Sequence, residues 1–185
     1  PFRIPASPSS EHQAYAAGVT SPVTSSPDIR PPTGDDLAWM LDLNNAHARE
    51  LSWLTADELH ELVTTAAQVA VSAPVAFVLC FDQDAPYTSP NFIWHRERFD
   101  RFRYVDRVVV DPDVRGQGIA RRLYQHVFAA AAAAGAPRIV AEINAEPANP
   151  ASDAFHARFG FVEVGRAAVT GQDKVVRYVA ADIPA

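Results

Sequence analysis

A short turn rich in glycine offers the clearest chemistry in this 185-residue chain. It reads Arg115-Gly116-Gln117-Gly118-Ile119-Ala120, and residues with helical spacing follow it. A helix that opens on such a turn presents unpaired backbone N–H groups at the positive end of its dipole, which attracts an anion. Glycine lets the backbone approach a bulky diphosphate, and Arg115 and Gln117 add side-chain donors. We therefore predict a phosphate-binding turn.

The turn differs from two other phosphate-binding motifs. It lacks the Gly-Lys-Ser/Thr ending of ATP-binding loops, and its glycines do not have the Gly-x-Gly-x-x-Gly spacing of dinucleotide-binding folds. A kinase or a dehydrogenase is therefore not expected. Because a glycine turn can also simply join a strand to a helix, the turn alone does not identify the ligand.

Two segments in a fixed order resemble the GNAT acetyltransferase superfamily. The segment 108–120 is similar to its pyrophosphate-loop motif, Arg/Gln-x-x-Gly-x-Gly/Ala, which Arg115 starts and Gly118 and Ala120 complete. The segment 149–161 resembles its second motif, an Asn that opens a helix ending in Gly-Phe. More loosely, Asn91-Phe92-Ile93-Trp94 and Tyr104-Val105-Asp106-Arg107 resemble a bacterial subgroup of predicted GNAT proteins. The resemblance implies an N-acetyltransferase that uses acetyl-CoA.

The resemblance also implies how the coenzyme is held. The sheet would splay between strands 102–110 and 138–143, and the pantetheine arm would lie in the opening like an extra strand. The thioester carbonyl would meet a main-chain N–H there, an oxyanion-type contact. Asn149 has a second interpretation, because Asn followed by Pro is a favourable helix start. The implied coenzyme-binding residues are Val108, Val109, Val110, Arg115, Gly116, Gln117, Gly118, Ile119, Ala120, Asn149, Ser152 and Phe155.

Two carboxylates are candidates for the base that amine acetylation requires. A pH of 7 is roughly 3.4 units below the pKa of a lysine-like ammonium, so forming the neutral amine that can attack costs about 4.6 kcal/mol. Glu142 stands in a mostly apolar strand, where burying a carboxylate is costly unless it has a polar partner or a functional role. Asp106 matches an acidic position that some family members use, and strand alternation predicts that it shares the face of Val108 and Val110. Its alternative is an ion pair with Arg107, and either acid could act through a water molecule.

His156 stands where the family commonly has a tyrosine that protonates the leaving thiolate. An imidazole titrates near pH 6.5 and could serve as that acid or as a base. The alternative interpretation is a surface histidine on a helix. The departure from tyrosine also motivates a different function, a non-catalytic sensor that binds acyl-CoA without turnover.

The acceptor pocket is expected to draw on the first helix and on the segment 82–104. The direct attack of a primary amine, from a small molecule or a peptide, would take place there in a ternary complex with the coenzyme. No motif identifies that amine. The predicted substrate-binding residues, each of which could instead be a packing residue, are Asn44, Asn45, Tyr87, Asn91, Trp94 and Tyr104.

Composition argues against several other classes of function. A net charge of −6 and a pI near 5.4 disfavour polyanion binding, and acidic residues interrupt the arginine-rich segment 96–107 that would suggest a nucleic-acid-binding domain. The six histidines lack metal-binding spacing, so no metal is expected. No apolar run approaches the ~20 residues of a membrane span. The single cysteine, Cys80, cannot form an internal disulfide, so a reducing cytoplasm is expected. We expect a cytoplasmic monomer or homodimer, with no membrane or nucleic-acid partner.

Hydrophobic spacing predicts one α/β (α+β) domain over residues 28–185, preceded by a flexible tail or surface strap over residues 1–27. The same spacing predicts about seven strands and about four helices in the order βααβββαβαββ. The resemblance to the GNAT superfamily implies that these strands form a mixed, mostly antiparallel central sheet flanked by the helices. The expected strands are 28–31, 68–72, 75–81, 102–110, 138–143, 163–170 and 174–181, the last two joined by a turn at 171–173. The expected helices are 33–49, 55–66, 119–135 and 150–158.

Overall fold

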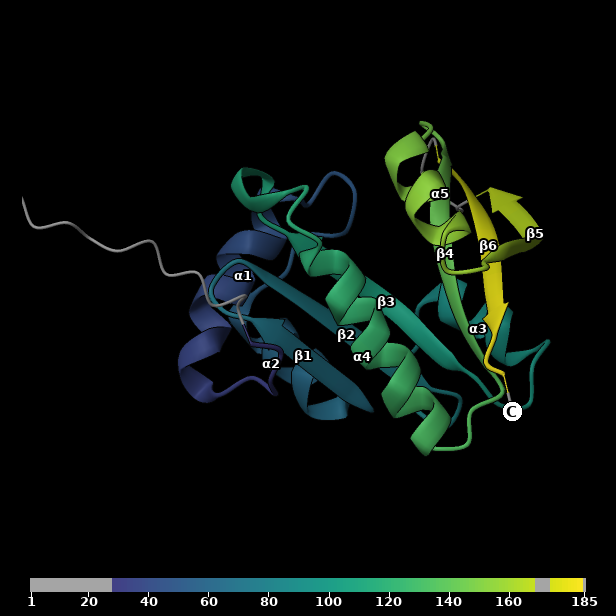
Figure 1. Cartoon of the computed structure of the whole chain (residues 1–185), viewed down its shortest axis with the longest axis horizontal. Helices are drawn as coiled ribbons and strands as arrows, with labels where there is room; N and C mark the ends of the chain where they lie inside the picture. Colours follow the sequence, from purple (N-terminus) through teal and green to yellow (C-terminus); the bar gives the residue numbers. More distant parts are fainter. Residues whose placement is uncertain (1–27, 169–173, 185) are drawn as a thin grey trace, which may run out of the picture.

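The computed structural model describes residues 28–168 and 174–184, which form one six-stranded mixed sheet with helices on both faces (Figure 1). The strand order is β1-β2-β3-β4-β6-β5. Among the described residues, no helix has the length and apolar character needed to cross a membrane. The elements are η1 (Gly34–Asp36), α1 (Leu37–Ala46), α2 (Ala56–Thr65), β1 (Gln68–Ser72), β2 (Ala76–Asp82), α3 (Pro90–Arg96), β3 (Arg103–Val110), η2 (Pro112–Val114), α4 (Ile119–Ala133), β4 (Arg138–Glu146), α5 (Pro150–Ala157), β5 (Val162–Ala168) and β6 (Val175–Asp182).

The predicted mixed, mostly antiparallel sheet is confirmed, but the predicted number of strands is wrong by one. The segment 28–31 is not a strand: Arg30 forms an isolated antiparallel bridge with Val71, and the next residue, Pro31, has no N–H to extend the pairing. The first helix ends at Ala46 rather than near residue 49. The predicted tail over residues 1–27 and the turn at 171–173 lie outside the described residues.

An additional helix, α3, occupies part of the segment 82–98, where no helix was predicted. It begins with Pro90 at its first turn, where the missing N–H of proline costs nothing. Phe92 and His95 are fully buried and anchor it on the sheet. Because the helix has only seven residues, its periodicity is too short to stand out in the sequence.

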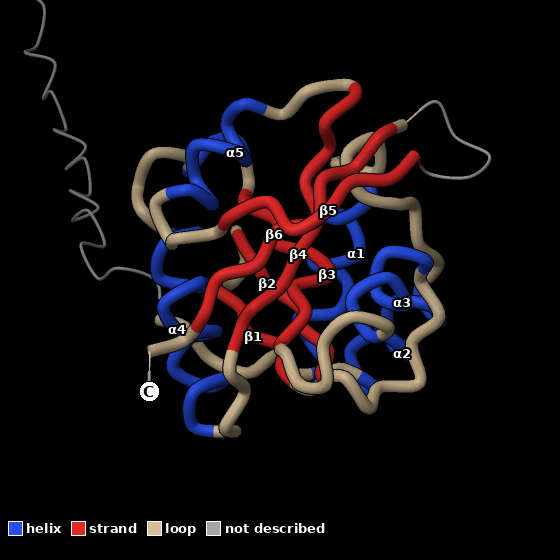
Figure 2. Tube along the Cα trace, turned by 90° about the vertical axis from the view of Figure 1, so that its right-hand side faces the viewer, coloured by secondary structure: helices blue, strands red, loops and turns tan. Residues whose placement is uncertain are grey.

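The helices divide between the two faces of the sheet (Figure 2). Helices α4 and α5 lie on one face, and α1, α2 and α3 lie on the other. Strand β2 packs against both layers: Val78 and Cys80 face α4, while Phe77 and Phe81 face the opposite helices, as the alternation of a strand requires. All four side chains are fully buried.

The sheet splays between β3 and β4, as the family resemblance implied. These strands run parallel and pair only at Arg103 with Ile139 and at Tyr104 with Val140. Beyond Tyr104 they diverge, so that the inner backbone edges of both strands lack a strand partner up to Val110 on β3. Figure 1 shows the two halves of the sheet separating toward α5. The opening leaves backbone N–H and C=O groups for another extended chain.

A β-bulge interrupts β3 beside this opening. The register with β2 shifts between Leu79 and Cys80, which leaves Asp106 without an opposite residue. A bulge redirects side chains from the regular alternation. Val108 packs on the α4 face, whereas the Asp106 carboxylate accepts a hydrogen bond from Tyr87 on the other face. The expectation that Asp106 shares the face of Val108 is therefore wrong.

Candidate functional site

Two adjoining cavities occupy the opening between β3 and β4. The larger, of about 850 Å³, runs along the end of β3, the start of α4 and the inner side of α5. The smaller, of about 390 Å³, lies deeper, between β3, β4, α4 and the segment before α3. Both are lined by Glu50, Leu51, Val108, Asn144, Asn149, Ser152 and His156. These shared residues mark a junction at which a ligand in one cavity can meet a ligand in the other.

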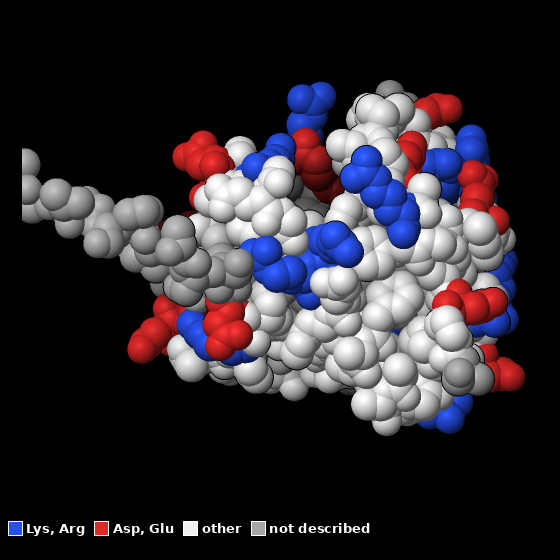
Figure 3. Space-filling model, in the orientation of Figure 1, with Lys and Arg blue, Asp and Glu red and all other residues white. Residues whose placement is uncertain are grey.

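The larger cavity has the features of an anion site. Gly116 and Gly118 adopt φ angles of 81° and 75°, a left-handed region that other residues rarely occupy, and Gly118 caps α4. The first N–H groups of this 15-residue helix have no partner within the helix, and they lie at the positive end of its dipole. Figure 3 shows basic side chains gathered around the hollow between α4 and α5. The cationic residues that line it are Arg49, Arg115, Arg121 and Arg158.

A diphosphate with a long uncharged arm fits this donor set. Positive charge and helix N–H groups surround the outer part of the cavity, and the unpaired edge of β3 follows farther in. All of the predicted coenzyme-binding residues line it except Gln117.

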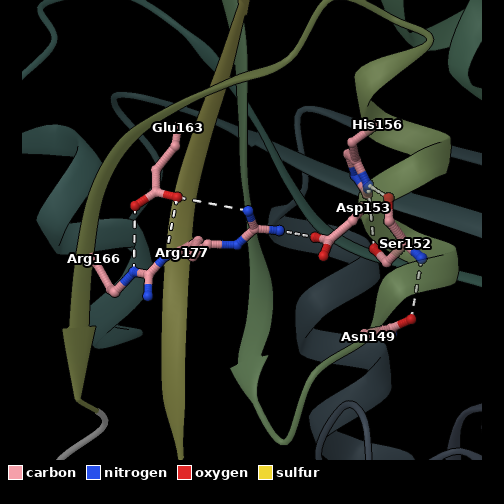
Figure 4. Close-up of polar contacts among 7 residues, drawn as sticks. All are labelled: Asn149, Ser152, Asp153, His156, Glu163, Arg166 and Arg177. Atoms are coloured by element: carbon pink, nitrogen blue, oxygen red, sulfur yellow. Dashed lines mark hydrogen bonds and ion pairs between the residues drawn. The ribbon is translucent and has the colours of Figure 1, made fainter.

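Asn149 caps helix α5, which was the second of the two roles that the sequence allowed for this residue. Its Oδ1 accepts a hydrogen bond from the backbone N–H of Ser152 at 3.1 Å. Asn149 also lines both cavities, so the cap sets the position of this helix end beside them. On the far side of α5, Arg177 of β6 donates to Asp153 and lies 3.6 Å from Glu163 (Figure 4). These contacts fix the helix that carries His156.

Glu142 lies in β4 with its side chain in the smaller cavity. Its Oε1 accepts hydrogen bonds from Asn91 Nδ2 and from the Tyr104 hydroxyl, both at 3.0 Å. Its Oε2 is buried and has no hydrogen-bond partner among the described residues. Burial, and then the charge of Asp106, raise the pKa of Glu142 to about 7, although the two hydrogen bonds act in the opposite direction. A carboxyl group with this pKa exchanges protons readily near neutral pH.

Asp106 also lines the smaller cavity, but both of its oxygens are engaged. Arg107 Nε donates to Oδ2 at 2.6 Å, and the Tyr87 hydroxyl donates to Oδ1 at 2.7 Å. Arg107 is held in turn by Asn44, whose Oδ1 accepts from Nη1 at 2.8 Å. The ion pair considered from the sequence is therefore present. Of the two candidate bases, Glu142 is the one with an unpartnered oxygen.

The residues predicted to bind the acceptor fall into two groups. Tyr87 and Asn91 line the smaller cavity. Four others do not line it and make packing or structural contacts instead: Asn44, Asn45, Trp94 and Tyr104. Trp94, for example, stacks on Tyr178 with ring centroids 4.0 Å apart, and Asn45 bonds the backbone of Leu54.

Several residues of the smaller cavity were not foreseen from the sequence. Glu50, Leu51 and Ser52 come from the loop after α1, which Asn44 holds by donating to the carbonyl of Ser52 at 2.9 Å. Lys174, the single lysine of the chain, also lines the cavity. No motif marks the loop, whereas the uniqueness of Lys174 was a readable signal.

His156 is not the surface histidine that the sequence allowed, because it is only 5% exposed. Its Nδ1 lies 2.8 Å from the carbonyl oxygen of Ser152, and its Nε2 lies 2.7 Å from the Tyr124 hydroxyl. Burial lowers the pKa of His156 and raises that of Tyr124. Tyr124 was missed in the sequence because its helical spacing is equally that of a core residue.

Among residues 28–168 and 174–184, no group of three or more His, Cys, Asp or Glu side chains is arranged to hold a metal ion.

Comparison with known proteins places these features in a family context. The family described as "Acetyltransferase (GNAT) family" matches residues 34–161. The chain is 28% identical over 127 residues to the peptidyl-lysine N-acetyltransferase YjaB of Salmonella typhimurium, covering 69% of each chain.

Solved structures share the fold at lower identity. An N-acetyltransferase from Staphylococcus aureus Mu50 superposes with a TM-score of 0.65 and 22% identity, covering 85% of this chain and 98% of its own. The protein yncA of Salmonella typhimurium, solved with its cofactor acetyl-CoA, superposes with a TM-score of 0.63 and 18% identity, covering 85% of this chain and 94% of its own. Ard1 of Thermoplasma volcanium gives 0.69 and 13%, covering 87% and 100%.

Proposed function

We propose that this chain, which belongs to the GNAT acetyltransferase family and is an N-acetyltransferase, moves an acetyl group from acetyl-CoA to a primary amine of a small molecule or a peptide. One observation carries the proposal. A cation-lined cavity that fits a diphosphate meets, at the splay of the sheet, a smaller cavity in which Glu142 presents an unpartnered carboxylate oxygen. The amine would react at that junction.

The larger cavity provides the coenzyme contacts. The N–H groups at the start of α4 and the Arg115 side chain would hold the diphosphate, while the inner edge of β3 near Val108 would pair with the pantetheine arm. When bound, acetyl-CoA supplies a thioester whose acyl carbon the amine attacks and whose sulfur leaves. Backbone N–H groups at the splay would stabilise the charge that develops on the acyl oxygen.

Glu142 is the base in this proposal. Asn91 and Tyr104 fix Oε1, so Oε2 is the oxygen left to take a proton from the acceptor ammonium. With a pKa of about 7, Glu142 is a far stronger base than an exposed glutamate, so the difference in pKa between the base and the acceptor ammonium is smaller. A coenzyme sensor has no need of such a base, so this carboxylate favours catalysis over sensing.

An amine panel tests the function. The purified protein is incubated with acetyl-CoA and a lysine peptide, a peptide with a free α-amine or a small primary amine, and released thiol is measured, while coenzyme affinity is measured by calorimetry. The lysine peptide comes first because YjaB is named a peptidyl-lysine N-acetyltransferase. We expect release with at least one amine and a loss of about 100-fold or more in Glu142→Gln. Tight binding without release from any amine would indicate a sensor, and absence of both would end the proposal.

A further inference from the structure

Tyr124 and His156 form a second polar pair at the junction of the cavities. The Tyr124 hydroxyl lies 2.7 Å from His156 Nε2, and both residues line the smaller cavity. Tyr124 is fully buried, and the rings of Phe155 and Phe159 lie 4.9 and 5.2 Å from its own, measured between centroids. An apolar surround of this kind excludes water and strengthens a hydrogen bond. The pair therefore lies in the wall of the smaller cavity, with aromatic rings packed around Tyr124.

The contacts of the imidazole determine where its proton resides. A carbonyl oxygen can only accept, so His156 Nδ1 must donate to the Ser152 carbonyl at 2.8 Å. The Ser152 hydroxyl, 3.2 Å away, is the other polar group near Nδ1. Because burial lowers the pKa of His156, the ring is neutral and Nε2 carries a lone pair. The Tyr124 hydroxyl consequently donates its proton to Nε2.

A phenol alone is poorly suited to protonate the departing thiolate. A thiol has a pKa of about 8.5 and a tyrosine about 10, so this transfer is uphill by roughly a factor of 30 before burial is counted. Burial raises the pKa of Tyr124 further. An imidazolium, with a pKa near 6.5 or lower, is a stronger acid than the thiol and can complete the transfer.

We propose that Tyr124 and His156 together relay a proton from the acceptor nitrogen to the leaving sulfur. This inference rests on the proposed function. Glu142 takes one proton from the acceptor ammonium, which leaves a neutral amine. When this amine forms the N–C bond, its nitrogen becomes positively charged and must lose a second proton. The Tyr124 oxygen accepts that second proton while its own proton passes to His156 Nε2.

The return step restores both residues. His156 Nε2 gives its proton back to the Tyr124 oxygen, and the hydroxyl gives its proton to sulfur as the C–S bond breaks. No electron is gained or lost, and no buried phenolate forms. Because nitrogen and sulfur are bonded to the same acyl carbon during transfer, one hydroxyl group can serve both. Tyr124 is then a catalytic residue, and His156 acts through it.

The relay is tested by varying the leaving group. Tyr124→Phe keeps the ring among its aromatic neighbours, and His156→Gln keeps a side chain that can accept from the hydroxyl but cannot carry the proton onward. We expect kcat/KM with acetyl-CoA to fall about 100-fold or more in each. With the selenium analogue of acetyl-CoA, whose leaving group is the conjugate base of a stronger acid, the loss should shrink to less than about 10-fold. An equal loss with both donors would mean a structural role, and no loss with either would mean direct transfer; both outcomes overturn the relay.

Two measurements without turnover complete the test. Thiolate absorbance of the CoA complex reports the pKa of the bound thiol, which we expect to be higher in Tyr124→Phe than in the wild type because a donor to sulfur is lost. Nitrogen NMR of the ligand-free protein should show His156 protonated at Nδ1 only. An unchanged thiol pKa in Tyr124→Phe contradicts the relay. A proton on Nε2 instead of Nδ1 also contradicts it, and that measurement uses the wild type and needs no folded variant. A wild type that acetylates no amine refutes the proposed function instead, whatever these two measurements give.

Discussion

Replacement of Glu142 by glutamine should stabilise the protein at alkaline pH while it removes activity. The change is isosteric: the amide oxygen can still accept from Asn91 and Tyr104, and the unpartnered Oε2 is replaced by the uncharged amide nitrogen Nε2. What disappears is the negative charge that wild-type Glu142 must carry in a half-buried position at high pH. Stability and activity are thus expected to move in opposite directions.

The size of the gain follows from the pKa of Glu142. It lies at about 7 in the folded protein against 4.5 for an ordinary glutamate. A raised carboxyl pKa means that the contribution of Glu142 to stability is fully present below pH 4.5 and is lost as the pH rises to 7. A shift of this size means that ionisation of Glu142 destabilises the folded protein by about 3 kcal/mol at pH 8 and by less than about 1 kcal/mol at pH 5. Glu142→Gln should therefore gain about 2–3 kcal/mol on the wild type between these two pH values.

Urea unfolding of both proteins at pH 5, 6.5 and 8 measures this difference. Glu146→Gln is the matched control, because Glu146 is an exposed residue of the same strand and its replacement should leave the difference nearly flat. The activity of the wild type should fall as the pH drops below 7, and this dependence should vanish in Glu142→Gln. A stability difference that does not grow between pH 5 and pH 8 would refute the reasoning, since the charge of Glu142 would then cost nothing in the folded state.

Three further changes test the architecture around the site. Burial lowers the pKa of His95 to about 4, so the contribution of His95 to stability is present above pH 6.5 and is lost as the pH falls. Between pH 7 and pH 5, His95→Phe should therefore gain about 2 kcal/mol of unfolding free energy relative to the wild type, measured by urea unfolding. Gly165→Ala would place a Cβ in steric overlap with the Trp94 ring and should cost about 1–3 kcal/mol of stability with a change in tryptophan fluorescence. The control, Gly34→Ala, adds its Cβ in open space and should show neither effect. Asn149→Ala should lose about 1 kcal/mol of capping and Asn149→Ser much less, so equal thermal stabilities would argue against the cap.

The parts of the fold that the sequence predicts well are those set by local pattern. The β1–β2 hairpin follows from two short apolar runs on either side of a proline break, and the α4 turn follows from glycines at positive φ. The helix α3 could not be predicted in the same way, since its seven residues are held by burial of Phe92 against Phe102 and Tyr104 rather than by their own periodicity.

The candidate site divides along the same line. The predicted coenzyme residues all lie within two sequence motifs, and the structure places all of them except Gln117 on the wall of the larger cavity. The choice between Glu142 and Asp106 could not be made in advance, because it depends on hydrogen bonds that reach 51 residues from Asn91 and 38 residues from Tyr104 to Glu142. The bulge at Asp106 is likewise a property of strand pairing rather than of composition.

The splay gives these separate groups access to one ligand. Glu142 is held by Asn91 and Tyr104 on the face of the sheet that α3 covers, whereas Tyr124 and His156 belong to α4 and α5 on the opposite face. In a closed sheet the paired backbone would separate two such layers of side chains. Here β3 and β4 stop pairing after Tyr104, so groups from both faces line the same cavity. In the proposed reaction, Glu142 therefore receives the first proton from one side of the acceptor nitrogen and the Tyr124 hydroxyl receives the second from the other.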